Sequence, residues 1–265
     1  MMKSYIGMFK TEIKRMFSLK CFLSSVLFMI ILLLLGAIMY FREYEWEYVK
    51  LYYIFEGMTV GGFFVELIYI PASLFASTNL CMDIRQKGYY LYSSRSGKLP
   101  YIISKILVGV LFAFVVTEVA FKIVVGLGAC VMPIADADYY TGGADVFEDV
   151  LRFSPVLFFE MRIFFISLST GLFTAVGMII TVAMPNIYIA VMSSFLASRI
   201  IPEISYLFPL PTEMHIQAIS EGFIRVSSSA LVSILYAFVF FTALTLVSSA
   251  IFVMVMKRRC YGAKG

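Results

Sequence analysis

Charged residues are scarce in this chain, at 14% of 265 residues, whereas an ordinary soluble domain has about 25%. Histidine and tryptophan occur once each, and the four cysteines lie far apart with no CxxC spacing. These shortages exclude a disordered chain, a nucleic-acid-binding domain, a disulfide framework and a cysteine-based zinc site. Hydrophobic residues make up 61% of the chain, which predicts an integral membrane protein with little soluble mass.

Six long apolar runs predict six transmembrane helices, because crossing a bilayer core takes roughly 20 apolar residues in a helix. The runs are 22–40, 57–82, 106–132, 163–184, 187–201 and 230–256. The fifth run is short and follows a tight turn at Pro185-Asn186. The alternation of apolar and polar residues that a membrane β-barrel needs is absent, so the predicted fold class is all-α integral membrane.

Lysine and arginine gather in three segments that an even number of spans places on one side of the membrane. The N-terminal segment, the loop at 83–105 and the C-terminal tail hold five, five and four of the 21 basic residues, beside two acids, Glu12 and Asp83. Most of the other acids fall on the opposite side. The positive-inside rule therefore predicts a multi-pass protein of the cell membrane with both termini in the cytoplasm.

Residues 1–20 predict an amphipathic helix that lies in the lipid headgroup layer. Apolar residues recur on one face at helical spacing: Ile6, Phe9, Ile13, Met16 and Phe17. Lysines occupy the other faces, which suits contact with anionic lipid. A secretory signal peptide is the alternative, because a basic segment precedes an apolar run. That run is longer than a signal-peptide core and lacks a small-x-small cleavage motif after it, which favours the uncleaved interfacial helix.

Two segments on the opposite side have distinct patterns. Residues 202–222 predict a re-entrant hairpin, because prolines interrupt an apolar stretch and Thr212 can cap a short helix that ends at Gly222. Irregular backbone at membrane depth is tolerated where protein covers it. Residues 41–56 interleave acids with aromatic side chains, which predicts an interfacial aromatic belt or, alternatively, a surface for a cationic amphipathic cargo.

The loop at 83–105 contains Asp83, Gly88, Arg95 and Lys105 in order, with a tyrosine-rich stretch between the glycine and the arginine. This arrangement resembles the loop between spans two and three of ABC-2 type permeases, the membrane subunits of many bacterial ABC exporters. In that family an acid and a glycine precede a short amphipathic helix, a turn follows, and a lysine opens span three. The order of elements along the whole chain is similar to that of the family as well.

The resemblance implies the ABC-2 type exporter fold, with an interfacial helix, six spans, a cytoplasmic coupling helix and an outer re-entrant hairpin in one transmembrane domain. It also implies a dimer with a second permease copy or a paralogue, and contact with a separate ABC ATPase that binds ATP and Mg. Pro100 departs from the family pattern because it falls later than the usual proline.

The same loop combines apolar anchors with a charged rim, as a protein interface needs. The candidate ATPase-coupling residues are Asp83, Arg85, Lys87, Tyr89, Tyr92, Arg95, Lys98 and Lys105. The alternative is a solvated basic loop that lies on anionic lipid. Leu99 follows Gly97-Lys98 where a phosphate-binding loop requires Ser or Thr, so we expect no nucleotide cofactor on this chain.

Glu66, Glu118 and Lys122 fall inside predicted spans, where charge is rare and usually meaningful. Glu118 and Lys122 are four residues apart and share a helix face, so they can pair. Glu66 and Lys122 both lie roughly 14–15 Å from the outer ends of sequential antiparallel spans, which predicts a contact between them. The cluster is interpreted as a neutralising latch, with the polar lining of a translocation path as the alternative.

Enzyme chemistry is disfavoured by what the sequence holds. The single histidine, His215, excludes an HExxH metal site, and Ser167-Leu-Ser-Thr-Gly171 lacks the leading glycine of GxSxG, so we predict no catalytic residue and no metal. The resemblance implies instead a permease subunit that exports an amphipathic substrate, with a cationic peptide as the favoured guess. A membrane anchor or immunity protein that binds a toxin or lipid without transporting it is the alternative.

Overall fold

The computed structural model describes residues 2–41, 50–59, 66–88, 97–134, 148–208, 211, 214–220, 226–227 and 229–262. Regular structure in this part of the chain is helical, without strands. Five of its helices are long and apolar enough to cross a membrane: α2 (Leu19–Phe41), α7 (Lys98–Val131), α9 (Pro155–Ala183), α10 (Ile187–Leu207) and α12 (Ala230–Gly262). The chain is therefore an all-α, membrane-embedded protein.

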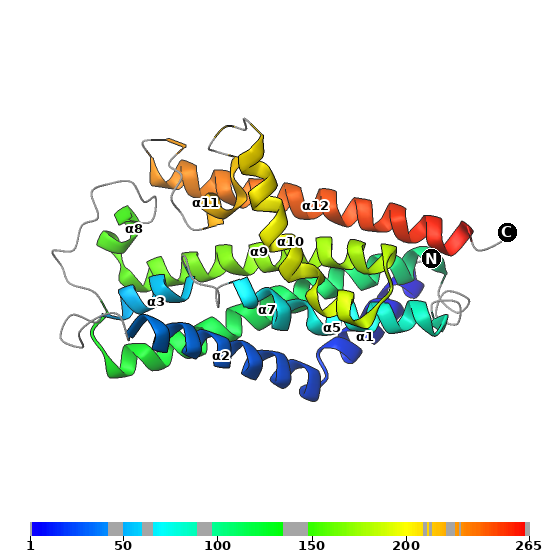
Figure 1. The fold of residues 1–265 in the computed structure, drawn as a ribbon, viewed down its shortest axis with the longest axis horizontal. Coiled ribbons are helices and arrows are strands. Elements are labelled where there is room, and N and C mark those ends of the chain that lie inside the picture. Colours follow the sequence, from blue (N-terminus) through cyan, green and yellow to red (C-terminus); the bar gives the residue numbers. More distant parts are fainter. Residues whose placement is uncertain are drawn as a thin grey trace.

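The long helices form one bundle in which α2, α7, α9 and α12 run lengthwise and α10 crosses obliquely (Figure 1). The shorter helices are α1 (Met2–Met16), α3 (Leu51–Thr59), α5 (Tyr69–Arg85), α8 (Glu148–Phe153) and α11 (Ile216–Ser220). Both chain termini lie at the same end of the bundle, which we call the terminal end (Figure 1). α3 and α8 lie at the opposite end, which we call the far end.

Helix α9 lies at the centre of the bundle and packs against α5, α7, α10 and α12. It is the most buried of the five long helices, and α12 is the least buried. Small residues permit the close approach: a Cβ added at Gly177 would lie 2.2 Å from the Ser194 Oγ of α10. A hydrogen bond of 3.0 Å between the hydroxyls of Thr117 and Thr170 joins α7 to α9. In membranes no hydrophobic driving force brings helices together, so small residues that allow close approach and hydroxyls that bond across helices stabilise their packing.

The long helices cover the predicted runs and extend beyond them. α7 begins at Lys98 and not at 106, so the end of the predicted coupling loop is helical. α9 begins at Pro155 and not at 163, because the Ser154 Oγ accepts a hydrogen bond of 3.4 Å from the Leu157 N–H and a proline suits the first turn. The prediction ended the apolar runs where charged residues begin, but Lys, Arg and Glu are good helix formers and do not by themselves end a helix.

The predicted second span, 57–82, is not among the five long apolar helices. Its described residues are 57–59 in α3, 66–68, and 69–82 in α5, and residues 60–65 lie outside the described part of the chain. α5 has 17 residues and covers roughly 25 Å at 1.5 Å per residue, which is less than the bilayer core of about 30 Å. The structure therefore supports a membrane-embedded helical bundle and leaves the six-span arrangement a prediction.

The segment predicted as a re-entrant hairpin, 202–222, begins as a continuation of α10. Pro202 lies inside that helix, which runs on to Leu207. The short helix predicted after Thr212 corresponds to α11, which packs on α9. The residues at 209–210, 212–213 and 221–225 lie outside the described part of the chain, and so do residues 42–49 of the aromatic segment at 41–56.

Helix α1 is present as predicted, and its buried side overlaps the predicted apolar face. Met16 of that face is almost completely buried, and Phe9, Ile13 and Phe17 pack against the core, whereas Ile6 is 49% exposed. The helix packs on α7, and its buried side also includes Met8 and Glu12, which the prediction left out. A buried glutamate on the packing face requires a partner from another helix, because an unpaired buried charge is costly.

Candidate functional site

Three helices meet at the terminal end through a set of ionic and polar side chains that is buried except for the partly exposed Arg15. The Lys105 Nζ of α7 lies 2.9 Å from the Glu12 Oε2 of α1 and 2.6 Å from the Asp83 Oδ2 of α5. The Arg15 Nη1 of α1 donates to the Asp83 Oδ1 at 2.9 Å, and the Tyr101 hydroxyl donates to the Asp83 Oδ2 at 3.0 Å. We call these five residues the terminal ionic network.

The spacing of these residues along α1 and α7 places the members from one helix on the same face of that helix. Glu12 and Arg15 are three residues apart on α1, and Tyr101 and Lys105 are four residues apart on α7, so each pair shares a helix face. Asp83 lies in the last turn of α5. Two carboxylates and two cations make the set neutral, which is the condition for burying charges without a large desolvation penalty.

Basic side chains also join other helices at the terminal end. The Lys98 Nζ, at the start of α7, donates to the Cys260 carbonyl oxygen of α12 at 2.9 Å. Arg259 donates to the Val182 carbonyl oxygen near the end of α9. The last carbonyls of a helix lack a partner within it, so cations there satisfy them and complement the helix dipole. These contacts hold the ends of α7, α9 and α12 together.

The candidate coupling residues divide into three groups. Asp83 and Lys105 are buried in the terminal ionic network, and Lys98 binds α12, so these three side chains connect helices within the bundle. Arg85 and Lys87 are exposed where α5 ends. The other candidates, Tyr89, Tyr92 and Arg95, lie outside the described part of the chain. Among the described candidates, only Arg85 and Lys87 are therefore exposed at the end of α5 where a partner protein could contact them.

A second ionic cluster lies nearer the far end of the bundle. The Lys122 Nζ lies 3.1 Å from the Glu118 Oε2, which is the predicted pair four residues apart on α7. It also lies 2.7 Å from the Glu160 Oε2 of α9, a partner that the sequence did not predict. We call these three residues the far-end cluster.

The predicted contact between Glu66 and Lys122 is wrong. Glu66 pairs instead with Arg199 of α10. The depth argument compared only sequential helices, but α5 packs against α10 as well as α7. Equal depth places two groups at the same level in the membrane. They form a contact only if their helices are also neighbours in the bundle.

The far-end cluster lies less deep in the membrane than the length of the apolar run implied. α7 has 34 residues and covers about 51 Å, so its ends project beyond a hydrocarbon core of about 30 Å. Lys105 and Lys122 are separated by roughly 25 Å along the helix axis. A membrane that contains both therefore has the terminal ionic network near one edge of the core and the far-end cluster near the other.

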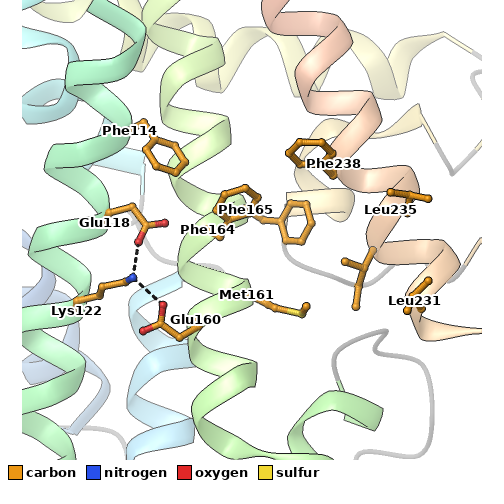
Figure 2. Close-up of a pocket in the computed structure, with 11 residues that line it drawn as sticks. Phe114, Glu118, Lys122, Glu160, Met161, Phe164, Phe165, Leu231, Leu235 and Phe238 are labelled. Carbon is orange, nitrogen blue, oxygen red and sulfur yellow. Dashed lines mark ion pairs between the residues drawn. The ribbon is translucent and has the colours of Figure 1, made fainter.

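A cavity of about 680 Å³ opens between α7, α9 and α12 beside this cluster. We call it the far-end groove. Figure 2 shows Lys122 between the Glu118 and Glu160 carboxylates on one side of the groove, with aromatic rings from all three helices around the rest. The aromatic residues are Phe114, Phe164, Phe165 and Phe238. The groove is thus charged at one place and apolar elsewhere.

Sequence reasoning missed Glu12, Arg15, Glu160 and Arg162 as functional or anchoring residues. The signal for Glu12 was available, because it and Asp83 are the two acids in the basic segments and both are found buried. Arg162 is buried in the bundle, and its Nη2 donates to the Glu56 Oε1 of α3 at 3.1 Å. Its charge argued against a transmembrane position, so the predicted run began one residue after it.

Comparisons with known proteins give no relative: no family model, no curated protein and no solved structure matches the chain. Within the described residues, no group of histidine, cysteine, aspartate or glutamate side chains is arranged to hold a metal ion. The two ionic clusters and the far-end groove are therefore the features of the chain that bear on its function.

Proposed function

We propose that this chain is the permease subunit of an ATP-driven exporter of the ABC-2 type. It works as a dimer with a second copy or a paralogue, in a six-span arrangement in the cell membrane. A separate ATPase binds ATP and Mg, and the permease moves an amphipathic substrate outward, with a cationic peptide as the favoured class. In this proposal the terminal end faces the cytoplasm.

The terminal ionic network is the observation that supports the proposal best. Its residues join α1 to the end of α5 and the start of α7, the two helices that flank the segment at 86–97. A push on that segment would reach α1, α5 and α7 together, because buried ion pairs in a low-dielectric interior resist separation. Such a joint is what an external ATPase needs in order to move membrane helices.

The exposed cations next to the network supply a rim for docking. Arg85 and Lys87 lie on the surface where α5 ends, while Asp83, two residues earlier than Arg85, is internal. Rim charges of this kind steer association and set specificity more than they add affinity. An anchor or immunity protein would need neither the rim nor the rigid joint.

The test is charge reversal at the rim, with Arg85→Glu and Lys87→Glu combined with Tyr92→Ala at the predicted anchor. We expect loss of copurification with the ATPase encoded beside this chain, and loss of cargo-stimulated ATP turnover in liposomes. The matched control is Lys10→Glu with Lys14→Glu, because these lysines are exposed on α1 at the same end of the bundle.

Both variants should elute as folded protein in size-exclusion chromatography, since the four altered cations, Arg85, Lys87, Lys10 and Lys14, are exposed. Normal ATPase binding and turnover in the triple variant would overturn the coupling assignment. A chain that binds cargo without any effect on ATP turnover, with wild-type residues at the rim, would favour the anchor or immunity alternative.

A further inference from the structure

The far-end groove is walled on one side by α12, the least buried of the five long helices. α12 contributes Leu231, Leu235 and Phe238, which are 72%, 57% and 40% exposed. In a membrane-embedded bundle, apolar side chains exposed on a long apolar helix face lipid. The groove is therefore open to the bilayer, and a membrane amphiphile can enter it from the side.

The charged part of the groove has an excess of negative charge. Glu118 and Glu160 share a single cation, Lys122, within the far-end cluster. The Glu118 side chain is 14% exposed, whereas Glu160 and Lys122 are 49% and 45% exposed. The Glu160 carboxylate and the Lys122 ammonium thus remain accessible to a ligand. A second cation beside Glu160 would bring the net charge of the cluster to zero.

The charged and the aromatic residues of the groove lie at different depths in the membrane. Phe114 lies one helical turn from Glu118 on α7, in the direction of the membrane centre, and Phe164 stands in the same relation to Glu160 on α9. Phe238 lies two turns inward from Leu231 on α12. The charged residues are therefore near the edge of the hydrocarbon core and the aromatic ones deeper, as the head and the tail of a lipid are.

We propose that the far-end groove binds one phospholipid with a primary-amine headgroup. The headgroup ammonium donates hydrogen bonds to Glu160, the phosphate lies against Lys122, and an acyl chain follows the aromatic residues inward. The cavity volume of about 680 Å³ falls within the range of small-molecule sites, about 300–1,000 Å³. Anionic headgroups are disfavoured by the excess carboxylate, and a quaternary ammonium lacks the N–H groups that make charge-assisted hydrogen bonds.

This inference does not rest on export, because it requires only that the chain is embedded in a membrane. A lipid site would stabilise the packing of α7, α9 and α12 whatever the chain transports or binds. The experiment below contains neither ATPase nor cargo, so its failure leaves the proposed function untouched, and the failure of the proposed function leaves the lipid site untouched.

The test is native mass spectrometry of the delipidated, detergent-purified chain with equal amounts of phosphatidylethanolamine, phosphatidylcholine and phosphatidylglycerol. We expect phosphatidylethanolamine to be retained roughly tenfold over phosphatidylglycerol, as one charge-assisted hydrogen bond allows. Glu160→Gln should abolish the preference while keeping the Lys122–Glu118 pair. Leu235→Trp should lower retention of all three lipids by filling the groove.

Glu203→Gln, which alters an exposed acid of α10 outside the groove, is the matched control and should bind as wild type does. Equal retention of phosphatidylethanolamine and phosphatidylglycerol by the wild type would overturn the proposal. An unchanged preference in Glu160→Gln would overturn it as well. So would stronger retention of a single-tailed alkylammonium probe than of phosphatidylethanolamine, since that would make the groove a site for cationic amphiphiles.

Discussion

Removal of Lys105 is the sharpest test of the terminal ionic network. The Lys105 ammonium contacts two carboxylates, and in the described part of the chain it is the ion-pair partner of Glu12. Asp83 would keep Arg15 and Tyr101, so Lys105→Met strands chiefly Glu12, which is 1% exposed. Stranding one buried charge costs about 3–5 kcal/mol. At about 2–4 °C per kcal/mol, the midpoint of thermal unfolding should fall by roughly 6–20 °C.

The double variant Glu12→Leu with Lys105→Met distinguishes a stranded charge from a lost contact. It removes both members of the pair and leaves the contacts of Asp83 with Arg15 and Tyr101 in place, so most of the lost stability should return. The midpoint is measured by size-exclusion chromatography after heating in detergent. Lys14→Met, which alters an exposed lysine of α1, is the control. A single variant as stable as the wild type, or a double variant no better than the single one, refutes the reasoning.

Two further predictions concern packing and charge within the bundle. Gly177→Ala should destabilise the protein by about 1–3 kcal/mol, because the new Cβ would overlap Ser194 on the neighbouring helix. Gly126→Ala is the control: nothing lies within 4 Å of its Cβ, so it should be neutral or slightly stabilising. The midpoints of thermal unfolding of the two variants check this. Glu56→Leu should lower the midpoint more than Arg162→Met does. Arg162 is 1% exposed and stays charged when it loses the Glu56 carboxylate, whereas Glu56, which is 20% exposed, can take up a proton when it loses Arg162. Equal midpoints for those two variants would contradict this argument.

The local part of the far-end cluster could be predicted from the sequence, and the rest could not. Glu118 and Lys122 meet because they are four residues apart on a helix, and that spacing is fixed before any helix packs. Glu160 joins them only because α9 stands beside α7. Glu66 finds Arg199 for the same kind of reason, since its partner depends on the position of α10.

The lengths of the helices show a similar division. Apolar runs located the long helices, because a backbone in lipid must satisfy its hydrogen bonds within the segment. Their true starts, at Lys98 and Pro155, lie before charged residues at which the predicted runs stopped, Lys105 in α7 and Arg162 in α9. Lys105 is helical and buried because Glu12 and Asp83 come from two other helices to pair with it. No property of the α7 sequence alone contains that information.

By itself, the sequence determined that the protein is helical and membrane-embedded, since composition and run length depend on the residues and the solvent and not on neighbouring helices. Tertiary structure alone decided that Glu12 of α1 is buried. The apolar spacing indicated Met16 as part of the buried face, but it did not include Glu12, which is 1% exposed in the bundle. Burying a carboxylate is tolerated only where cations from other helices neutralise it. That condition is met in the folded bundle and not in the isolated helix.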